Sequence, residues 1–211
     1  MGNIKQLIEQ FHKYYYNSKV WTNGNTTWLG YPILKNPLDL FLYQEILYSV
    51  QPDIIIECGT YKGGSALFLC SILDSIGKGQ VLSIDISLKD NLPIHERLTY
   101  FQASSTSDEA IKKVKSMVKP TDSVMVILDS DHSKHHVLTE LKHYHSFVTT
   151  NSYLIVEDTN INGHPVFETF GPGPMEAVDE FLKENTNFTI DESKHKFLIS
   201  FNPRGYLKRR K

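Results

Sequence analysis

Apolar strand patterns alternate with helical patterns through most of the chain, and this alternation limits the folds open to it. Strands are predicted at residues 53–57, 81–86, 98–102, 123–129, 153–157, 187–191 and 196–201. Helices are predicted between them, at residues 63–76, 106–117, 133–147 and 174–185. Short strands that are apolar on both faces are typical of parallel sheets covered by helices. The pattern predicts an α/β fold with a doubly wound, seven-stranded, mostly parallel sheet.

The last two predicted strands, 187–191 and 196–201, are separated by only a short turn. A parallel connection needs a crossover of about a dozen residues or more, whereas antiparallel strands can be joined by a tight turn. We therefore expect an antiparallel last strand, paired in a hairpin at one edge of the sheet.

The remaining segments suggest a simple division of the chain. Residues 1–50 contain two predicted helices and an aromatic loop, which we expect to pack on the core. Residues 51–205 form the main α/β domain. Residues 206–211 end in Lys-Arg-Arg-Lys and are predicted to be a solvated basic tail.

Composition excludes several classes of function. The 211 residues carry a formal net charge of −2, so no overall positive field favours nucleic acid or an anionic membrane. No apolar run approaches the roughly 18 residues of a membrane span, and the first residues contain no apolar signal core. The two cysteines, Cys58 and Cys70, lie in apolar surroundings typical of buried, reduced thiols. We expect a cytoplasmic protein without a nucleic-acid partner.

A glycine-rich loop follows the first strand of the predicted main domain. In open α/β sheets the ligand binds beyond the carboxyl ends of the strands, where glycine permits tight turns and helix N-termini attract anions. The loop lacks the G-x-G-x-x-G pattern of dinucleotide-binding proteins. It resembles instead the E-x-G-x-x-x-G-G-S loop of S-adenosylmethionine-binding proteins. Its candidate cofactor-binding residues are Glu57, Gly59, Thr60, Tyr61, Gly63, Gly64 and Ser65.

The next strand ends add polar side chains to the same predicted pocket. Asp85 ends the second strand, where a carboxylate can accept hydrogen bonds from a ribose diol. Ser104 follows the third strand, where we expect the adenine, and Asp129 follows the fourth, where it also borders the cofactor. An alternative is that the glycines only shape a turn and that Asp85 only caps a helix.

Acidic residues gather after the fourth and fifth strands of the predicted sheet. The fourth runs into Asp129-Ser130-Asp131-His132, and the fifth into Glu157-Asp158. Neighbouring strands lie about 4.8 Å apart, so these carboxylates would repel one another unless a cation lay among them. Oxygen ligands favour Mg²⁺ or another hard divalent cation. Helix capping by Asp131 is the competing explanation for one or two of these acids.

Longer motifs give the chain a specific resemblance. LDSDHS at 128–133 and YLIVEDTNINGHP at 153–165, with KNPLDL at 35–40 and YQEIL at 43–47, resemble the cephalosporin hydroxylase-like family of class I methyltransferases. The relatives of this family include Mg²⁺-dependent sugar O-methyltransferases. The resemblance implies that residues 51–205 are an S-adenosylmethionine-dependent methyltransferase domain.

The resemblance also implies roles for the acidic residues. Asp129, Glu157 and Asp158 would bind the metal, and Asp131 would be the general base, with His132 as the second candidate. The pair Glu157-Asp158 follows the cephalosporin hydroxylase pattern, whereas the sugar enzymes have Asp at the first position. A metal-bound hydroxyl loses its proton readily and can then attack the methyl sulfonium in line.

Two loops are candidates for the walls of an acceptor site. Residues 159–174 are rich in Gly and Pro, and we expect them to form a lid with His164 as a substrate contact. The aromatic loop 21–31 could form the opposite wall, with Trp21, Trp28 and Tyr31 stacking on a ring or sugar. Packing alone is the alternative explanation for Trp28.

The sequence thus predicts a metal-dependent S-adenosylmethionine O-methyltransferase acting on a hydroxyl of a small metabolite, sugar or glycan precursor. An NAD(P)-dependent oxidoreductase and a catalytically idle cofactor-binding partner subunit remain as alternatives, and a homo-oligomer is possible. Binding of S-adenosylhomocysteine or of NAD⁺ would separate the first two.

Overall fold

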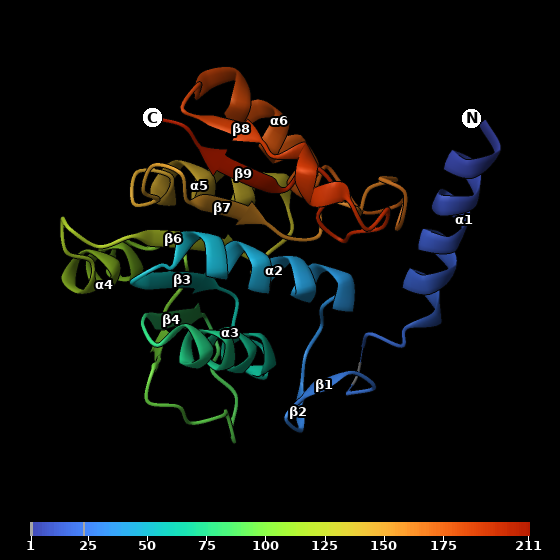
Figure 1. Cartoon of the computed structure of the whole chain (residues 1–211). Helices are drawn as coiled ribbons and strands as arrows, with labels where there is room; N and C mark the ends of the chain where they lie inside the picture. Colours follow the sequence, from blue (N-terminus) through green and yellow to red (C-terminus); the bar gives the residue numbers. More distant parts are fainter. Residues whose placement is uncertain (1, 23) are drawn as a thin grey trace.

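The computed structural model describes residues 2–22 and 24–211 as a layered α/β domain (Figure 1). Its helices are α1 (Gly2–Ser18), α2 (Pro37–Val50), α3 (Gly64–Ile76), α4 (Asp108–Met117), α5 (Lys134–Tyr144) and α6 (Pro174–Glu184), with a 3-10 turn η1 (Glu192–His195). Its strands are β1 (Thr27–Trp28), β2 (Tyr31–Pro32), β3 (Ile54–Cys58), β4 (Gln80–Asp85), β5 (Leu98–Gln102), β6 (Val124–Leu128), β7 (Tyr153–Val156), β8 (Phe188–Ile190) and β9 (Tyr206–Arg209). Within the described ranges, no helix combines the length and hydrophobicity needed to cross a bilayer.

The main sheet has seven strands in the order β5-β4-β3-β6-β7-β9-β8. Strands β3 to β7 pair in parallel, whereas β9 runs antiparallel to both β7 and β8. The strand order reverses between β3 and β6, which is where open α/β sheets bind ligands. The predicted fold class, with its antiparallel last strand, is confirmed.

The position of the last strand differs from the prediction. Residues 196–201 form no strand, and the strand is β9, inside the segment expected to be a basic tail. Ser200 and the Phe201 N–H bond instead to the Asp39 carboxylate of α2, so this segment crosses the end of the sheet. Tyr206 and Leu207 are fully buried, one on each face of the sheet. Burial of these two side chains therefore favours a strand here, although four basic residues follow them.

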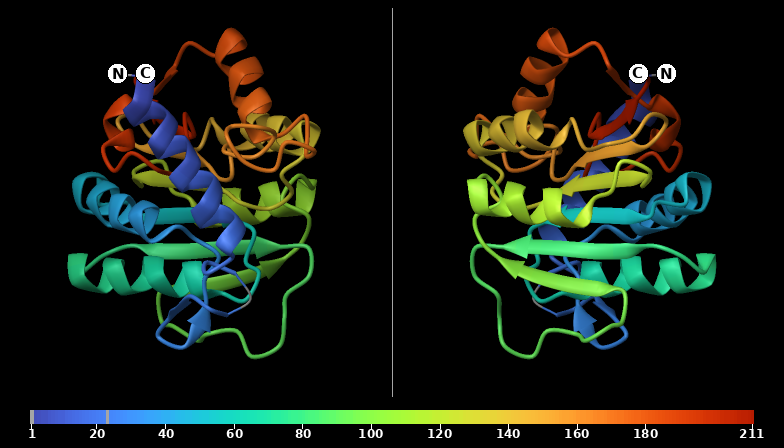
Figure 2. Two further views of the ribbon diagram at one scale, coloured as in Figure 1. Left: turned by 90° about the vertical axis from the view of Figure 1, so that its right-hand side faces the viewer. Right: turned by 90° about the vertical axis from the view of Figure 1, so that its left-hand side faces the viewer.

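Helices cover both faces of the sheet (Figures 1 and 2). One face packs on α2 and α3, with Ile55, Val81 and Met125 among its buried residues. The other packs on α4, α5 and α6, with Val126 and Leu154 at its centre. Successive strand residues alternate between the two clusters, as the pleat requires. Both faces are buried, which explains the nearly continuous apolar runs in the sequence.

Strand register places the candidate site residues at one level. Cys58 at the end of β3 pairs with Ile84 on one side and Leu128 on the other, and Leu128 pairs with Val156. The residues that follow these strands therefore emerge together at the carboxyl edge of the sheet. In the left view of Figure 2, α1 crosses in front of the sheet.

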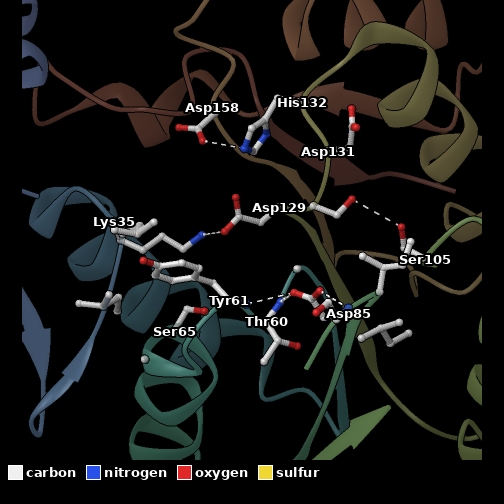
Figure 3. A pocket seen from close by; sticks show the side chains of 18 of the residues that line it. Lys35, Thr60, Tyr61, Ser65, Asp85, Ser105, Asp129, Asp131, His132 and Asp158 are labelled. Carbon is white, nitrogen blue, oxygen red and sulfur yellow. Dashed lines mark hydrogen bonds and ion pairs between the residues drawn. The ribbon is translucent and has the colours of Figure 1, made fainter. Parts of the chain in front are cut away.

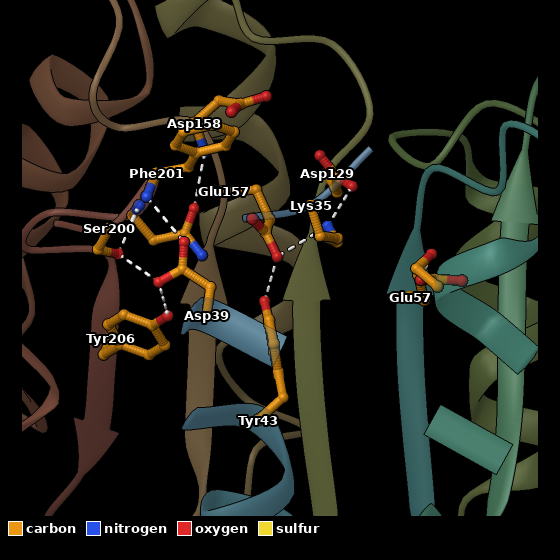
Figure 4. A network of polar contacts seen from close by, with 12 residues as sticks. Lys35, Asp39, Tyr43, Glu57, Asp129, Glu157, Asp158, Ser200, Phe201 and Tyr206 are labelled. Carbon is orange, nitrogen blue, oxygen red and sulfur yellow. Dashed lines mark hydrogen bonds and ion pairs between the residues drawn. The ribbon is translucent and has the colours of Figure 1, made fainter. Parts of the chain in front are cut away.

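A buried carboxylate joins the first half of the chain to the last strand. Asp39, in the first turn of α2, is 1% exposed. It accepts hydrogen bonds from the Ser200 hydroxyl at 2.6 Å, the Phe201 N–H at 2.8 Å and the Tyr206 hydroxyl at 2.9 Å (Figure 4). Burial raises the pKa of Asp39 to about 7, although these three donors oppose the shift.

Replacing Asp39 should therefore destabilise the fold. In Asp39→Ala the three donors lose their acceptor in a buried environment, and we expect a loss of about 3 kcal/mol in the free energy of unfolding. Asp179→Ala is the matched control, because Asp179 pairs with Arg204 on the surface and should cost less than about 1 kcal/mol. Urea unfolding of the two variants measures both values. Equal losses would contradict the structural role of Asp39.

Candidate functional site

A cavity of 820 Å³ lies at the carboxyl edge of the sheet, beside the point where strand order reverses (Figure 3). This size suits a cofactor together with part of an acceptor. Its lining comes from α1 and the following loop, the β2–α2 segment, and the loops after β3, β4, β5, β6 and β7. These residues include Tyr16, Trp21, Ile33, Lys35, Gly59, Thr60, Tyr61, Gly64, Ser65, Asp85, Ser104, Ser105, Asp129, Asp131, His132, His136 and Asp158.

The glycine loop packs directly against the next strand end. Gly59 has a φ of +102°, and a Cβ there would overlap the carbonyl group of Asp129. Only glycine suits both the conformation and the close approach. The Asp85 carboxylate accepts hydrogen bonds from the N–H groups of Thr60 at 2.9 Å and Tyr61 at 3.1 Å. Asp85 thus holds the loop in place and also faces the cavity.

Most of the predicted cofactor-binding residues line this cavity, and two do not. The lining residues are Gly59, Thr60, Tyr61, Gly64, Ser65, Asp85, Ser104 and Asp129. Gly63 packs against Pro93 and Tyr100 behind the loop. Glu57 is fully buried below it and accepts hydrogen bonds from Ser65 at 2.5 Å and Ser83 at 2.6 Å. Burial raises the pKa of Glu57.

Three side chains in the cavity form a candidate metal centre. Asp129, His132 and Asp158 each offer one ligand atom, and these atoms lie within 4.8 Å of one another. His132 Nε2 lies 3.2 Å from Asp158 Oδ2. Asp158 has a φ of +53°, and its N–H donates to the Asn202 side chain, which fixes the backbone there.

The electrostatics of this centre fit a divalent cation. Burial and the nearby carboxylates raise the pKa of Asp129, while Lys35 opposes the shift. Burial raises the pKa of Asp158 as well. Burial thus disfavours the ionised form of both carboxylates, and a cation coordinated by their oxygens would favour it. The donor set therefore fits Mg²⁺ or a similar ion.

Glu157, a predicted metal ligand, lies outside the three-residue centre. Its carboxylate accepts hydrogen bonds from the Tyr43 hydroxyl and from Lys35 Nζ, which lies 2.8 Å away (Figure 4). The same ammonium lies 2.5 Å from Asp129 Oδ2. Burial alone would lower the pKa of Lys35, but the two carboxylates raise it overall. The structure thus places a protein cation between two of the three predicted ligands.

The two candidate bases differ in their surroundings. Asp131 lines the cavity, but its Oδ1 accepts a hydrogen bond from the Ser133 N–H at 2.7 Å, before α5. Bonds from Ser133 lower the pKa of Asp131 and make it a weaker base. His132 faces Asp158, and Figure 3 shows Asp131 apart from this pair. The geometry favours His132 as the base.

Helix α1 and the loop after it form one wall of the cavity, which the sequence indicated only in part. Tyr16 and Trp21 line the cavity, and both rings pack on Phe201. His12, 5% exposed, stacks on Phe201 and hydrogen-bonds to Asn160 through Nε2 at 3.1 Å. Trp28, by contrast, packs on Phe68 below the cavity, in agreement with the packing alternative. The contacts of His12 had no signal in the sequence because their partners are distant in the chain.

The loop at 159–174 does not line the larger cavity. His164 Nε2 lies 2.7 Å from Glu176 Oε1, and His164 is not part of the cavity that contains Asp129 and Asp158. Phe167 borders a second cavity of 420 Å³, which shares Tyr16 and Trp21 with the first. His164, the expected substrate contact, thus lies outside the lining of the larger cavity.

Comparisons with known proteins identify relatives of this chain. The family model described as rhamnosyl O-methyltransferase/CmcI matches residues 18–210. A rhamnosyl O-methyltransferase of Mycobacterium leprae is 38% identical over 210 residues, which cover 97% of this chain and 91% of that protein. One of Mycobacterium tuberculosis is 41% identical over 208 residues, covering 95% and 84%. A solved structure of CmcI with Mg-SAM has a TM-score of 0.69 at 22% identity and covers 88% of this chain and 77% of that chain.

Acid should weaken the packing of α1 at the cavity. Burial lowers the pKa of His12 to about 4 from its ordinary value of 6.5. The neutral ring is the form that packs, so its stabilising effect is complete above pH 6.5 and is lost as the pH falls toward 4. At pH 5 we expect a loss of roughly 1–2 kcal/mol relative to pH 7.5.

Fluorescence of Trp21, in a Trp28→Phe background, follows the packing of α1 during urea unfolding at each pH. His12→Gln provides the control, since glutamine does not titrate and can still bond to Asn160. Its stability should fall less on acidification than that of the parent. Parallel pH profiles for the two proteins would exclude His12 as the titrating group.

Proposed function

Because the chain belongs to the rhamnosyl O-methyltransferase/CmcI family, we propose that it transfers a methyl group from S-adenosylmethionine to a sugar hydroxyl. The resemblance indicated by the LDSDHS and KNPLDL motifs is thereby confirmed. One observation carries the proposal: a single cavity joins the Gly59 loop to the centre formed by Asp129, His132 and Asp158. The relatives that are rhamnosyl O-methyltransferases support a sugar acceptor, and CmcI with Mg-SAM supports the cofactor and the ion.

The cofactor half of the cavity is formed by the loops after β3, β4 and β5. Backbone groups of Gly59 to Tyr61 border the space in which the methionine part would lie, and Asp85 is placed to accept hydrogen bonds from the ribose. Ser104 and Ser105 border the adenine end. The sulfonium carries its own activation, so the protein mainly aligns the donor with the acceptor oxygen.

The acceptor half contains the groups that activate a hydroxyl. Asp129 and Asp158 would hold a divalent cation, which supplies an electrostatic preference for the alkoxide form of a bound hydroxyl. With the ion held by these two carboxylates, His132 is not its ligand and would accept the proton, and Asp158 orients its imidazole ring. Tyr16 and Trp21 offer aromatic faces against which the sugar ring would pack.

Calorimetric titration tests the cofactor class. We expect the protein to bind S-adenosylhomocysteine and not NAD⁺, and we expect Gly59→Ala to abolish binding because its Cβ would overlap the Asp129 carbonyl. Tight binding of NAD⁺ instead would favour the oxidoreductase alternative. Binding of S-adenosylhomocysteine without methyl transfer to rhamnosides, other sugars or phenols, in Mg²⁺ or in EDTA, would favour the idle subunit.

Substitution of His132 tests the proposed base. With a sugar acceptor and saturating Mg²⁺, we expect His132→Ala to lower kcat by about 10²–10⁴-fold, the usual contribution of a general base. The affinity for S-adenosylhomocysteine should change little. Asp131→Asn is the control, and its kcat should fall only a few-fold because Asp131 mainly accepts from Ser133. If Asp131→Asn loses activity and His132→Ala keeps it, Asp131 is the base instead.

A further inference from the structure

Lys35 is a buried cation directly below the candidate metal centre. Its side chain is 5% exposed, and its ammonium contacts Asp129 at 2.5 Å and Glu157 at 2.8 Å (Figures 3 and 4). Among the described residues, Glu157 accepts one further side-chain hydrogen bond, from the Tyr43 hydroxyl. One positive charge thus compensates part of the negative charge carried by Asp129, Glu157 and Asp158.

The position of Lys35 is fixed by its neighbours in the chain. It follows β2 and precedes Asn36, whose side chain caps α2 by accepting from the Leu38 N–H at 3.1 Å. Helix α2 in turn supplies Tyr43 to Glu157 and Asp39 to the last strand. The backbone on both sides of Lys35 is therefore fixed. If its ammonium moved away, the carboxylates would be left buried without a counter-ion.

We propose that Lys35 is an internal counter-ion that shares Asp129 with the divalent cation, so that it stabilises the metal-free site and weakens metal binding. The inference rests on the proposed function, because it takes the cation to bind among these carboxylates. Lys35 then acts as a positioning residue that keeps Asp129 and Glu157 together before the cation arrives. It also sets the affinity of the site.

Coulomb repulsion gives the sign of the effect. An ammonium in contact with Asp129 lies within a few ångströms of any cation bound to the same carboxylate. At the effective dielectric of about 20 that applies to protein sites, removing such a charge should strengthen cation binding by about tenfold or more. A purely structural role for Lys35 would leave the affinity unchanged or reduce it, since a loosened site binds less well.

The test is calorimetric titration of the full chain with Mn²⁺ alone, together with thermal melting with and without Mg²⁺. Lys35→Met removes the charge at nearly constant length, and Lys35→Arg retains it. Lys78→Met is the matched control, because Lys78 pairs with Asp53 at 2.8 Å at the opposite end of β3.

For Lys35→Met we expect an Mn²⁺ Kd lower by tenfold or more. We also expect a metal-free Tm lower by roughly 5–10 °C and a larger recovery on adding Mg²⁺ than in the parent. Lys35→Arg should stay within about threefold of the parent Kd, and Lys78→Met should match it. An unchanged or higher Kd in Lys35→Met overturns the inference, even if methyl transfer is intact.

Two further outcomes are distinguishable. If Lys35→Met does not fold, the same substitution is compared with its parent in a Glu157→Gln background, where less buried charge is left unpaired. Tighter Mn²⁺ binding in the double variant supports the inference, and equal binding overturns it. If neither the parent nor any folded Lys35 variant binds Mn²⁺, the metal centre of the proposed function is itself wrong, and the inference falls with it.

Discussion

Negative charge at the carboxyl edge of the sheet is the constraint that organises this molecule. Parallel register brings Asp129, Glu157 and Asp158 to one level, in an environment where isolated charges are costly. Lys35 and Tyr43 relieve part of that cost from below. Both come from residues before the main sheet, so the N-terminal segment is a component of the site rather than an appendage to it.

The same segment also closes the fold. Asp39, four residues after Lys35, binds the chain just before β9 and the Tyr206 hydroxyl on it. Phe201, whose N–H donates to Asp39, is the residue on which His12 and Tyr16 of α1 and Trp21 of the following loop pack. Helix α2 therefore links the carboxylates, the last strand and the cavity wall. A substitution in one of these regions is expected to destabilise the others.

Hydrophobic patterning was sufficient to predict most of the sheet. Strands β3 to β7 were identified because each is a local apolar run bounded by turn residues. The prediction failed at the end of the chain, where residues 196–201 are more strand-like in sequence than β9. That choice depends on Asp39, which lies about 160 positions earlier, and no local pattern contains it.

By itself, the sequence determined the fold class, the turn at Gly59 and the edge of the sheet at which Asp85, Asp129 and Asp158 meet, because strand ends and glycine turns are local features. Only the tertiary structure decided how the acids are used. In the structure Glu157 pairs with Lys35, His132 faces Asp158, and Asp131 accepts a hydrogen bond from Ser133 just before α5. The physical reason is that the cost of a buried charge depends on partners that folding brings from distant parts of the chain.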